Sequence, residues 1–142
     1  MNSIKHYSIL LLIVLSIAGC NTNAERSAEG VAIAFFDAIY NQNNLKEAAL
    51  LCTPQFSKKL SKYVTTKNIA RRMLNMSFDS VKIDAGLGDI NVRQEFNNTG
   101  SLTILFTGTR QGKIYKELKR IKLIKKGDSW FVDKLLKDPI SS

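Results

Sequence analysis

The spacing of hydrophobic positions changes twice along the chain. An uncharged apolar run occupies residues 9–18. Apolar residues then recur at intervals of three and four up to about residue 74, which is typical of amphipathic helices. From about Ser77 onward they alternate with polar residues, which is typical of strands with one buried face. The pattern therefore predicts an apolar leader, then helices, then strands.

Three helices are predicted in the helical part. The first covers residues 27–41 with Ser27 as its cap, and the second covers residues 44–51 with Asn44 as its cap. The third is predicted as one continuous helix over residues 54–74, because proline is tolerated at a first helical position. The first helix is expected to bury a stripe of Val31, Phe35, Ala38 and Ile39, widened by Phe36 and Tyr40. The third is expected to turn inward Leu60, Tyr63, Val64, Ala70, Met73 and Leu74.

Four alternating runs follow, separated by turn sequences at residues 97–100, 108–112 and 126–129. The inward positions of these runs are Val81 and Ile83, then Ile90, Val92 and Phe96, then Leu102, Ile104 and Phe106, then Trp130 and Val132. Helices followed by a strand meander predict the α+β class, with N-terminal helices packed on a strongly curved antiparallel sheet.

The leader has the properties of an export signal. Lys5 and His6 precede the apolar run, which as a helix rises only about 15 Å, half of the roughly 30 Å hydrocarbon core of a membrane. The run ends in residues 15–20, Leu-Ser-Ile-Ala-Gly-Cys, which resemble the bacterial lipobox. That resemblance implies cleavage between Gly19 and Cys20 and attachment of a diacylglyceryl group to the sulfur of Cys20.

The expected organisation follows from this motif. Residues 1–19 are a lipoprotein signal peptide, residues 20–26 are the lipidated cysteine and a short tether, and residues 27–142 are one domain. An ordinary secretory signal is the alternative. The expected location is the cell envelope, on the periplasmic side of the outer membrane, because the resemblance associates inner-membrane retention with Asp where this chain has Asn21. The inner membrane is the other option, and the expected partner is the membrane itself through the lipid anchor.

Composition and cysteine content agree with one folded domain. The 142 residues are 44% hydrophobic, which excludes collagen-like and low-complexity chains. If Cys20 carries lipid, Cys52 has no partner within the chain. A buried, unreactive thiol is favoured over a nucleophile at Cys52, because the only histidine, His6, lies in the signal and cannot activate it.

Positive charge is concentrated in two segments. The chain has 21 Lys and Arg against 12 Asp and Glu, a net charge of +9, and the excess falls in residues 58–72 and 110–126. These segments predict contact with anionic envelope components or another envelope protein. The candidate residues are Lys58, Lys59, Lys62, Arg71, Lys116, Lys119, Arg120 and Lys122. A solvated basic face with no ligand is the alternative, and nucleic acid is not an expected partner because the aromatic residues follow core periods.

The element order and three segments resemble the nuclear transport factor 2-like superfamily. The segments are residues 31–40, 44–48 and 127–133, and the resemblance covers residues 27–137. It implies a cone-shaped domain with a pocket at its wide end. Some members are isomerases or cyclases that use acidic, Tyr or His groups in that pocket, whereas others bind or dimerise. The isomerase tyrosine would fall near Phe36, which has no hydroxyl group.

These observations favour a membrane-anchored, non-enzymatic binding or assembly domain with no catalytic residues, metal site or cofactor. The alternative is an isomerase or lyase acting on a hydrophobic small molecule, with Asp37 or another carboxylate inside the pocket beside a Tyr. Asp37 and Tyr40 are expected to have solvated or capping roles instead. A homodimer through the outer face of the sheet is a third possibility. Four strand carboxylates are expected on a wet sheet face: Asp79, Asp84, Asp89 and Glu95.

Overall fold

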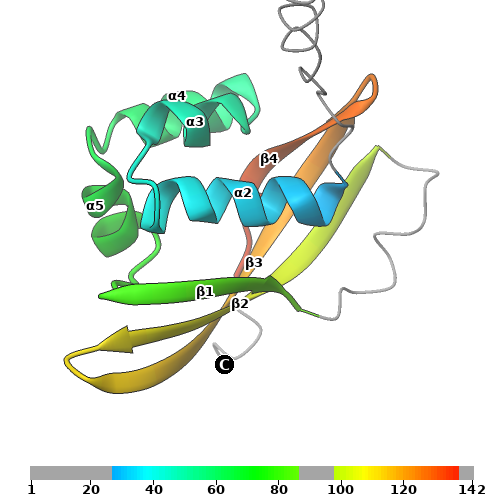
Figure 1. The fold of residues 1–142 in the computed structure, drawn as a ribbon. Coiled ribbons are helices and arrows are strands. Elements are labelled where there is room, and N and C mark those ends of the chain that lie inside the picture. Colours follow the sequence, from blue (N-terminus) through cyan, green and yellow to red (C-terminus); the bar gives the residue numbers. More distant parts are fainter. Residues whose placement is uncertain (1–26, 87–97, 138–142) are drawn as a thin grey trace, which may run out of the picture.

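The computed structural model describes residues 27–86 and 98–137, and it shows helices followed by a four-stranded antiparallel sheet (Figure 1). The α+β class predicted from the sequence is therefore confirmed. The leader, with Gly19 and Cys20, and the predicted strand with Ile90, Val92 and Phe96 lie outside the described residues. The helical segments are α2 (Ala28–Tyr40), α3 (Leu45–Leu50), α4 (Pro54–Ser61), α5 (Thr66–Asn68) and the π-helical turn η1 (Ile69–Met73). The strands are β1 (Ser80–Ala85), β2 (Thr99–Arg110), β3 (Lys113–Lys126) and β4 (Ser129–Leu135).

Side-chain caps begin the first three helices where the sequence predicts them. The hydroxyl of Ser27 accepts a hydrogen bond from the Gly30 N–H at 3.1 Å at the start of α2. The side chain of Asn44 does the same for the Glu47 N–H at the start of α3. Thr53 caps α4, and Pro54 occupies its first turn. Each cap supplies an acceptor for an N–H group that has no partner within its own helix.

The predicted continuous helix over residues 54–74 is wrong, because the chain breaks after Ser61. Val64 has a φ of 67°, which a helix does not allow, and its side chain is 74% exposed instead of buried. Thr65 then caps a new start by accepting the Asn68 N–H at 3.2 Å. Of the six residues expected to face inward, Leu60, Ala70 and Leu74 are buried, Tyr63 and Met73 are half-buried, and Val64 is exposed.

The strands pair in the order β1-β2-β3-β4, and all the pairs are antiparallel. A two-residue turn, Gln111–Gly112, joins β2 to β3, and both residues have positive φ values, as a tight hairpin with matching twist requires. Gly108 was predicted to belong to this turn, but it lies inside β2. The turn at residues 126–129 is confirmed between β3 and β4.

The helices pack on one face of the sheet, which curves around α2 (Figure 1). The predicted stripe of α2 is buried there, and Phe36 joins it. Its ring packs edge-to-face with those of Phe35 and Phe106, at centroid distances of 5.0 and 4.9 Å. The core therefore lies between α2 and the middle of β2 and β3.

Strand alternation divides the sheet residues between a helix-facing side and an outer side. Residues directly opposite each other in an antiparallel pair share a face. Leu102, Ile104 and Phe106 of β2 are fully buried against the helices, so their β3 partners face the same way. The residues between them face outward, where no helix of the described residues packs (Figure 1).

Within residues 27–86 and 98–137, no helix is long and apolar enough to cross a membrane.

Candidate functional site

The outer side of the sheet carries basic residues from three strands. We define the outer sheet face by the following residues: Lys82, Asp84, Leu105, Lys116, Leu118, Arg120, Lys122, Ile124, Phe131 and Lys134. On β3, the alternate positions 116, 120 and 122 are cationic, and they lie opposite Thr107, Thr103 and Ser101 of β2. The remaining β3 positions of this face, Leu118 and Ile124, are half-buried. The face is therefore cationic with apolar side chains between the charges.

Two lysines lie opposite each other on this face. A bulge between Lys122 and Leu123 shifts the register of β4, so that Lys122 pairs with Lys134. Like charges directly opposite in a sheet repel and destabilise the pair. The described residues place no carboxylate within 4.0 Å of either ammonium group, whereas Lys82 pairs with Asp84 at 3.2 Å. An anion bound between Lys122 and Lys134 would relieve this repulsion.

A shallow hollow adjoins this pair of lysines. It has a volume of about 270 Å³, and its lining comprises Thr99, Gly100, Ser101, Lys122 and Leu136. The lining combines the backbone of Gly100, the hydroxyl groups of Thr99 and Ser101 and one cation, a combination that suits a small anionic group.

The other basic residues singled out in the sequence lie elsewhere. Lys119 pairs with Ile104, which is buried against the helices. The Lys119 side chain therefore leaves β3 on the helix-facing side of the sheet. Lys58 and Lys59 are exposed on α4, which packs on β4 from the helix-facing side, and Lys62 follows directly after α4. Arg71 belongs to η1. The eight residues therefore do not form one surface, and only Lys116, Arg120 and Lys122 share the outer sheet face.

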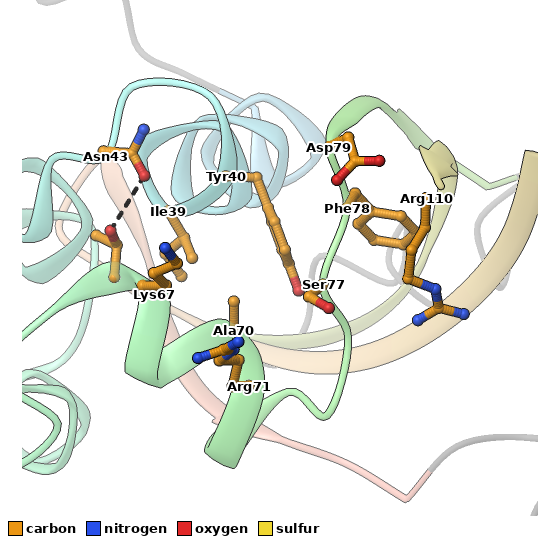
Figure 2. Close-up of a pocket in the computed structure, with 11 residues that line it drawn as sticks. Ile39, Tyr40, Asn43, Lys67, Ala70, Arg71, Ser77, Phe78, Asp79 and Arg110 are labelled. Atoms are coloured by element: carbon orange, nitrogen blue, oxygen red, sulfur yellow. Dashed lines mark hydrogen bonds between the residues drawn. The ribbon is translucent and has the colours of Figure 1, made fainter. Parts of the chain in front are cut away.

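A separate cavity lies at the C-terminal end of α2 (Figure 2). It has a volume of about 400 Å³ and is bounded by α2, α5, η1, the start of β1 and the end of β2. Lys67 and Arg71 lie on its helical side, and Asp79 and Arg110 lie on its strand side, with Tyr40 between them. The remaining lining residues are Ile39, Asn43, Thr66, Ala70, Ser77 and Phe78.

Tyr40 is held in this cavity as a neutral hydrogen-bond donor. Its hydroxyl donates to the carbonyl oxygen of Met76 at 3.1 Å. Burial raises the pKa of Tyr40, and the nearby carboxylate of Glu117 raises it further. Its expected solvated role is therefore not what the structure shows, because the side chain is half-buried and donates to backbone.

Among the described carboxylates, Glu117 acts on Tyr40 from the helix-facing side of β3, but it does not line the cavity. Asp37, expected to have a solvated or capping role, accepts hydrogen bonds from the side chains of Asn41 and Gln42, both at 2.7 Å, at the exposed end of α2, and it does not line the cavity. Asp79 lines the cavity, but its Oδ2 accepts the Gln111 N–H at 2.8 Å. Asp84 pairs with Lys82 on the outer sheet face, and Asp89 and Glu95 lie outside the described residues.

Cys52 is buried, as the sequence predicts. Its Sγ donates to the carbonyl oxygen of Ala48 at 3.1 Å, and burial raises the pKa of the thiol. A thiol that resists ionisation is a poor nucleophile and a poor metal ligand. Within the described ranges, no group of three or more His, Cys, Asp or Glu side chains is placed to hold a metal ion.

Some residues of these two sites were missed from the sequence. Lys134 joins the outer sheet face through the β4 register, and Lys67 and Arg110 join the cavity through contacts between distant elements. One sequence signal could have sorted the basic residues of β3. Successive side chains of a strand point to opposite faces, which places Lys119 on one face and Lys116 and Arg120 on the other.

Comparisons with known proteins add no assignment to this geometry. No family model matches the chain, and a search of curated proteins finds none that matches.

Proposed function

We propose that this chain is a bacterial lipoprotein whose lipid-bearing Cys20 holds a non-enzymatic binding domain at the cell envelope. The outer sheet face would contact the anionic lipid headgroups of the membrane that anchors it. The observation that carries this proposal is the Lys122–Lys134 pair, with Lys116 and Arg120 on the same face and all described helices on the other. The periplasmic side of the outer membrane is the proposed location.

The magnitude of the attraction is sufficient to orient a tethered domain. A basic residue near an anionic leaflet contributes about 1 kcal/mol, so three such residues contribute about 3 kcal/mol, or roughly a hundredfold in affinity. The attraction acts within a Debye length of about 8 Å, whereas a seven-residue tether reaches at most about 25 Å. The lipid would therefore keep the domain close, and the charges would decide which face meets the surface.

The apolar residues of the outer sheet face support the same orientation. Leu118 and Ile124 of β3 and Phe131 of β4 are half-buried without packing on the core. Such residues favour the boundary between headgroups and acyl chains, where an apolar surface is partly removed from water.

The rival functions are less well supported by the same geometry. An isomerase or lyase needs a tunable base and a donor aimed at substrate, but Tyr40 donates to backbone and Phe36 is fully buried with no hydroxyl group. A homodimer through the outer sheet face would bring two sets of like charges together. The nuclear transport factor 2-like cone is the fold that we propose, supported by the helix-then-meander order and the curved sheet.

Sedimentation with vesicles tests the surface contact. Residues 21–142 are mixed with phosphatidylcholine vesicles that contain an anionic lipid, at low and physiological salt. The triple variant Lys116→Gln, Lys122→Gln, Lys134→Gln should bind about a hundredfold more weakly than the wild type. The matched control is Lys58→Gln, Lys59→Gln, Lys62→Gln on the α4 side, which loses the same charge and should bind much as the wild type does.

Two results would contradict the proposal. Equal losses in both triple variants would show that only net charge matters, and an absence of wild-type binding at low salt would exclude the surface contact. Mass spectrometry of the native protein tests the anchor separately, because a native chain that begins at Met1, or an unmodified Cys20, would rule it out.

A further inference from the structure

We propose that the cavity between α2, η1 and the β2–β3 hairpin binds a small organic carboxylate, with its charged group between Lys67 and Arg71. This site is on the helix-facing side of the domain, so it is independent of the outer sheet face. Its volume of about 400 Å³ lies within the range of small-molecule sites, which is about 300–1,000 Å³.

The helical wall supplies two cations that have no anionic partner. Lys67 and Arg71 are four residues apart, so they project from the same side of consecutive turns, and both line the cavity. In the part of the chain that the structure describes, neither has a carboxylate within 4.0 Å. Two cations on one wall repel each other, and a carboxylate between them would neutralise that repulsion.

The wall is also shaped by an unusual backbone turn. In η1, the Leu74 N–H donates to the Ile69 carbonyl at 2.9 Å, a π-type bond that makes the turn wider than an α-helical one. Single π-helical turns are rare and occur frequently at functional sites. Here the turn contains Ala70 and Arg71, both of which line the cavity.

The strand wall is held in place by contacts that do not involve the proposed ligand. The guanidinium of Arg110 lies over the Tyr115 ring, 4.1 Å from its centroid. Asp79 is fixed by the Gln111 N–H. Ile39 of α2, Ala70 of the helical wall and Phe78 of the strand wall give the cavity an apolar surface against which the body of a ligand can pack.

The charges of the lining favour an anionic ligand. Lys67, Arg71 and Arg110 supply three positive charges, and Asp79 supplies one negative charge on the opposite wall. Because the positive charges outnumber the negative one, the lining attracts any anion, and the choice between anions depends on the shape and apolar surface of the ligand. Arginine also matches the planar geometry of a carboxylate with paired N–H donors. An aryl carboxylate, with a flat apolar body and one charge, therefore suits this lining better than inorganic phosphate.

Titration of the full chain in detergent tests the site. Phenylacetate, acetate and inorganic phosphate are added separately, while NMR follows the arginine side-chain N–H signals and calorimetry gives the affinity. Phenylacetate should shift the Arg71 signal and bind more tightly than acetate or phosphate. Arg71→Gln should weaken phenylacetate binding by about tenfold or more, the usual effect of losing one charge-assisted hydrogen bond.

The chain offers a matched control next to this residue. Arg72 is exposed in the same turn but does not line the cavity, so Arg72→Gln should leave the affinity within about twofold of the wild type. Equal losses in both variants, no response to phenylacetate at millimolar concentration, or tighter binding of phosphate would overturn the proposal. Arg71 is exposed, so its substitution leaves the core intact. The outer-face triple variant should keep its phenylacetate affinity, which separates this site from the proposed membrane contact.

Discussion

The aromatic ring of Phe78 packs directly on Gly108. Replacing Gly108 with a larger residue should destabilise the domain, because the added atoms would clash with this ring. A Cβ atom built on Gly108 lies 2.7 Å from Cγ and 2.9 Å from Cε1 of Phe78, whereas ordinary contact begins at 3.4 Å. The ring has little room to move inward, because it is stacked on Phe106 and tilted against Tyr40 at centroid distances of 6.3 and 5.7 Å. Gly108→Ala must therefore displace Phe78 toward the cavity.

The expected cost of Gly108→Ala is about 1–3 kcal/mol, the usual range for overpacking a well-filled site. In a Phe78→Ala background the added methyl group no longer meets these ring atoms. There the same substitution should be neutral or stabilising by up to about 1 kcal/mol, because alanine loses less backbone entropy on folding than glycine. The double-mutant cycle should thus give a coupling energy of about 1–4 kcal/mol between the two positions.

Urea unfolding followed by the fluorescence of Trp130, the only tryptophan, measures all four proteins of the cycle. Because Trp130 is half-buried against the core, its emission should report the loss of the folded domain. If Gly108→Ala costs the same in both backgrounds, the Phe78 ring does not rest on Gly108, and the inferred shape of the cavity wall is refuted.

Two further predictions follow from buried polar groups. Stability should fall as the pH rises above about 8.5, because Cys52 and Tyr40 have raised pKa values in the folded domain while their unfolded-state groups ionise near about 8.5 and 10. The free energy of unfolding is measured by urea titration at several pH values. Cys52→Ala should remove the loss of stability that begins at about pH 8.5, and Tyr40→Phe should remove the loss that begins at about pH 10. If the two variants lose stability with pH as the wild type does, the explanation is contradicted. Thr53→Ala should cost about 2 kcal/mol in the same assay, because Thr53 is 4% exposed, caps α4 and donates to Asp133 at 3.2 Å. Thr53→Ser keeps the hydroxyl group, so a similar loss there would disprove the hydrogen-bond explanation.

Local chemistry made the helix starts predictable. The caps at Ser27, Asn44 and Thr53 depend on residues within one turn of each other, so the sequence contains the whole interaction. The break after Ser61 also has a local sequence signal. It was overlooked because the helical spacing of apolar residues continues past the break. Residues 64–66 are three β-branched residues in a row, and Thr65 is followed three positions later by Asn68, whose N–H it caps.

Long-range contacts account for the features that could not be predicted. Gly108 has the composition of a turn residue, but its role depends on Phe78, thirty positions earlier, which covers it. The partner of Lys122 depends on a bulge, which places Lys134 opposite it and has no clear sequence signal. The sequence located β3 only by the turns on either side of it. Its inward positions could not be predicted, because β3 carries aliphatic residues on both faces and so lacks a clear alternation of apolar and polar residues.

β4 has one edge that does not pair with β3. The middle of this edge pairs with the backbone of the segment between α3 and α4. The Val132 N–H donates to the Leu51 carbonyl, and the Val132 carbonyl accepts the Thr53 N–H, both at 2.9 Å. An open strand edge is a template on which another chain can add a strand. Molecules confined to a membrane surface meet far more often than the same number in solution, so an exposed edge there would promote aggregation. On the membrane surface that we propose for this chain, the pairing of Val132 with the chain's own backbone would hinder a neighbouring copy from adding a strand to the middle of β4.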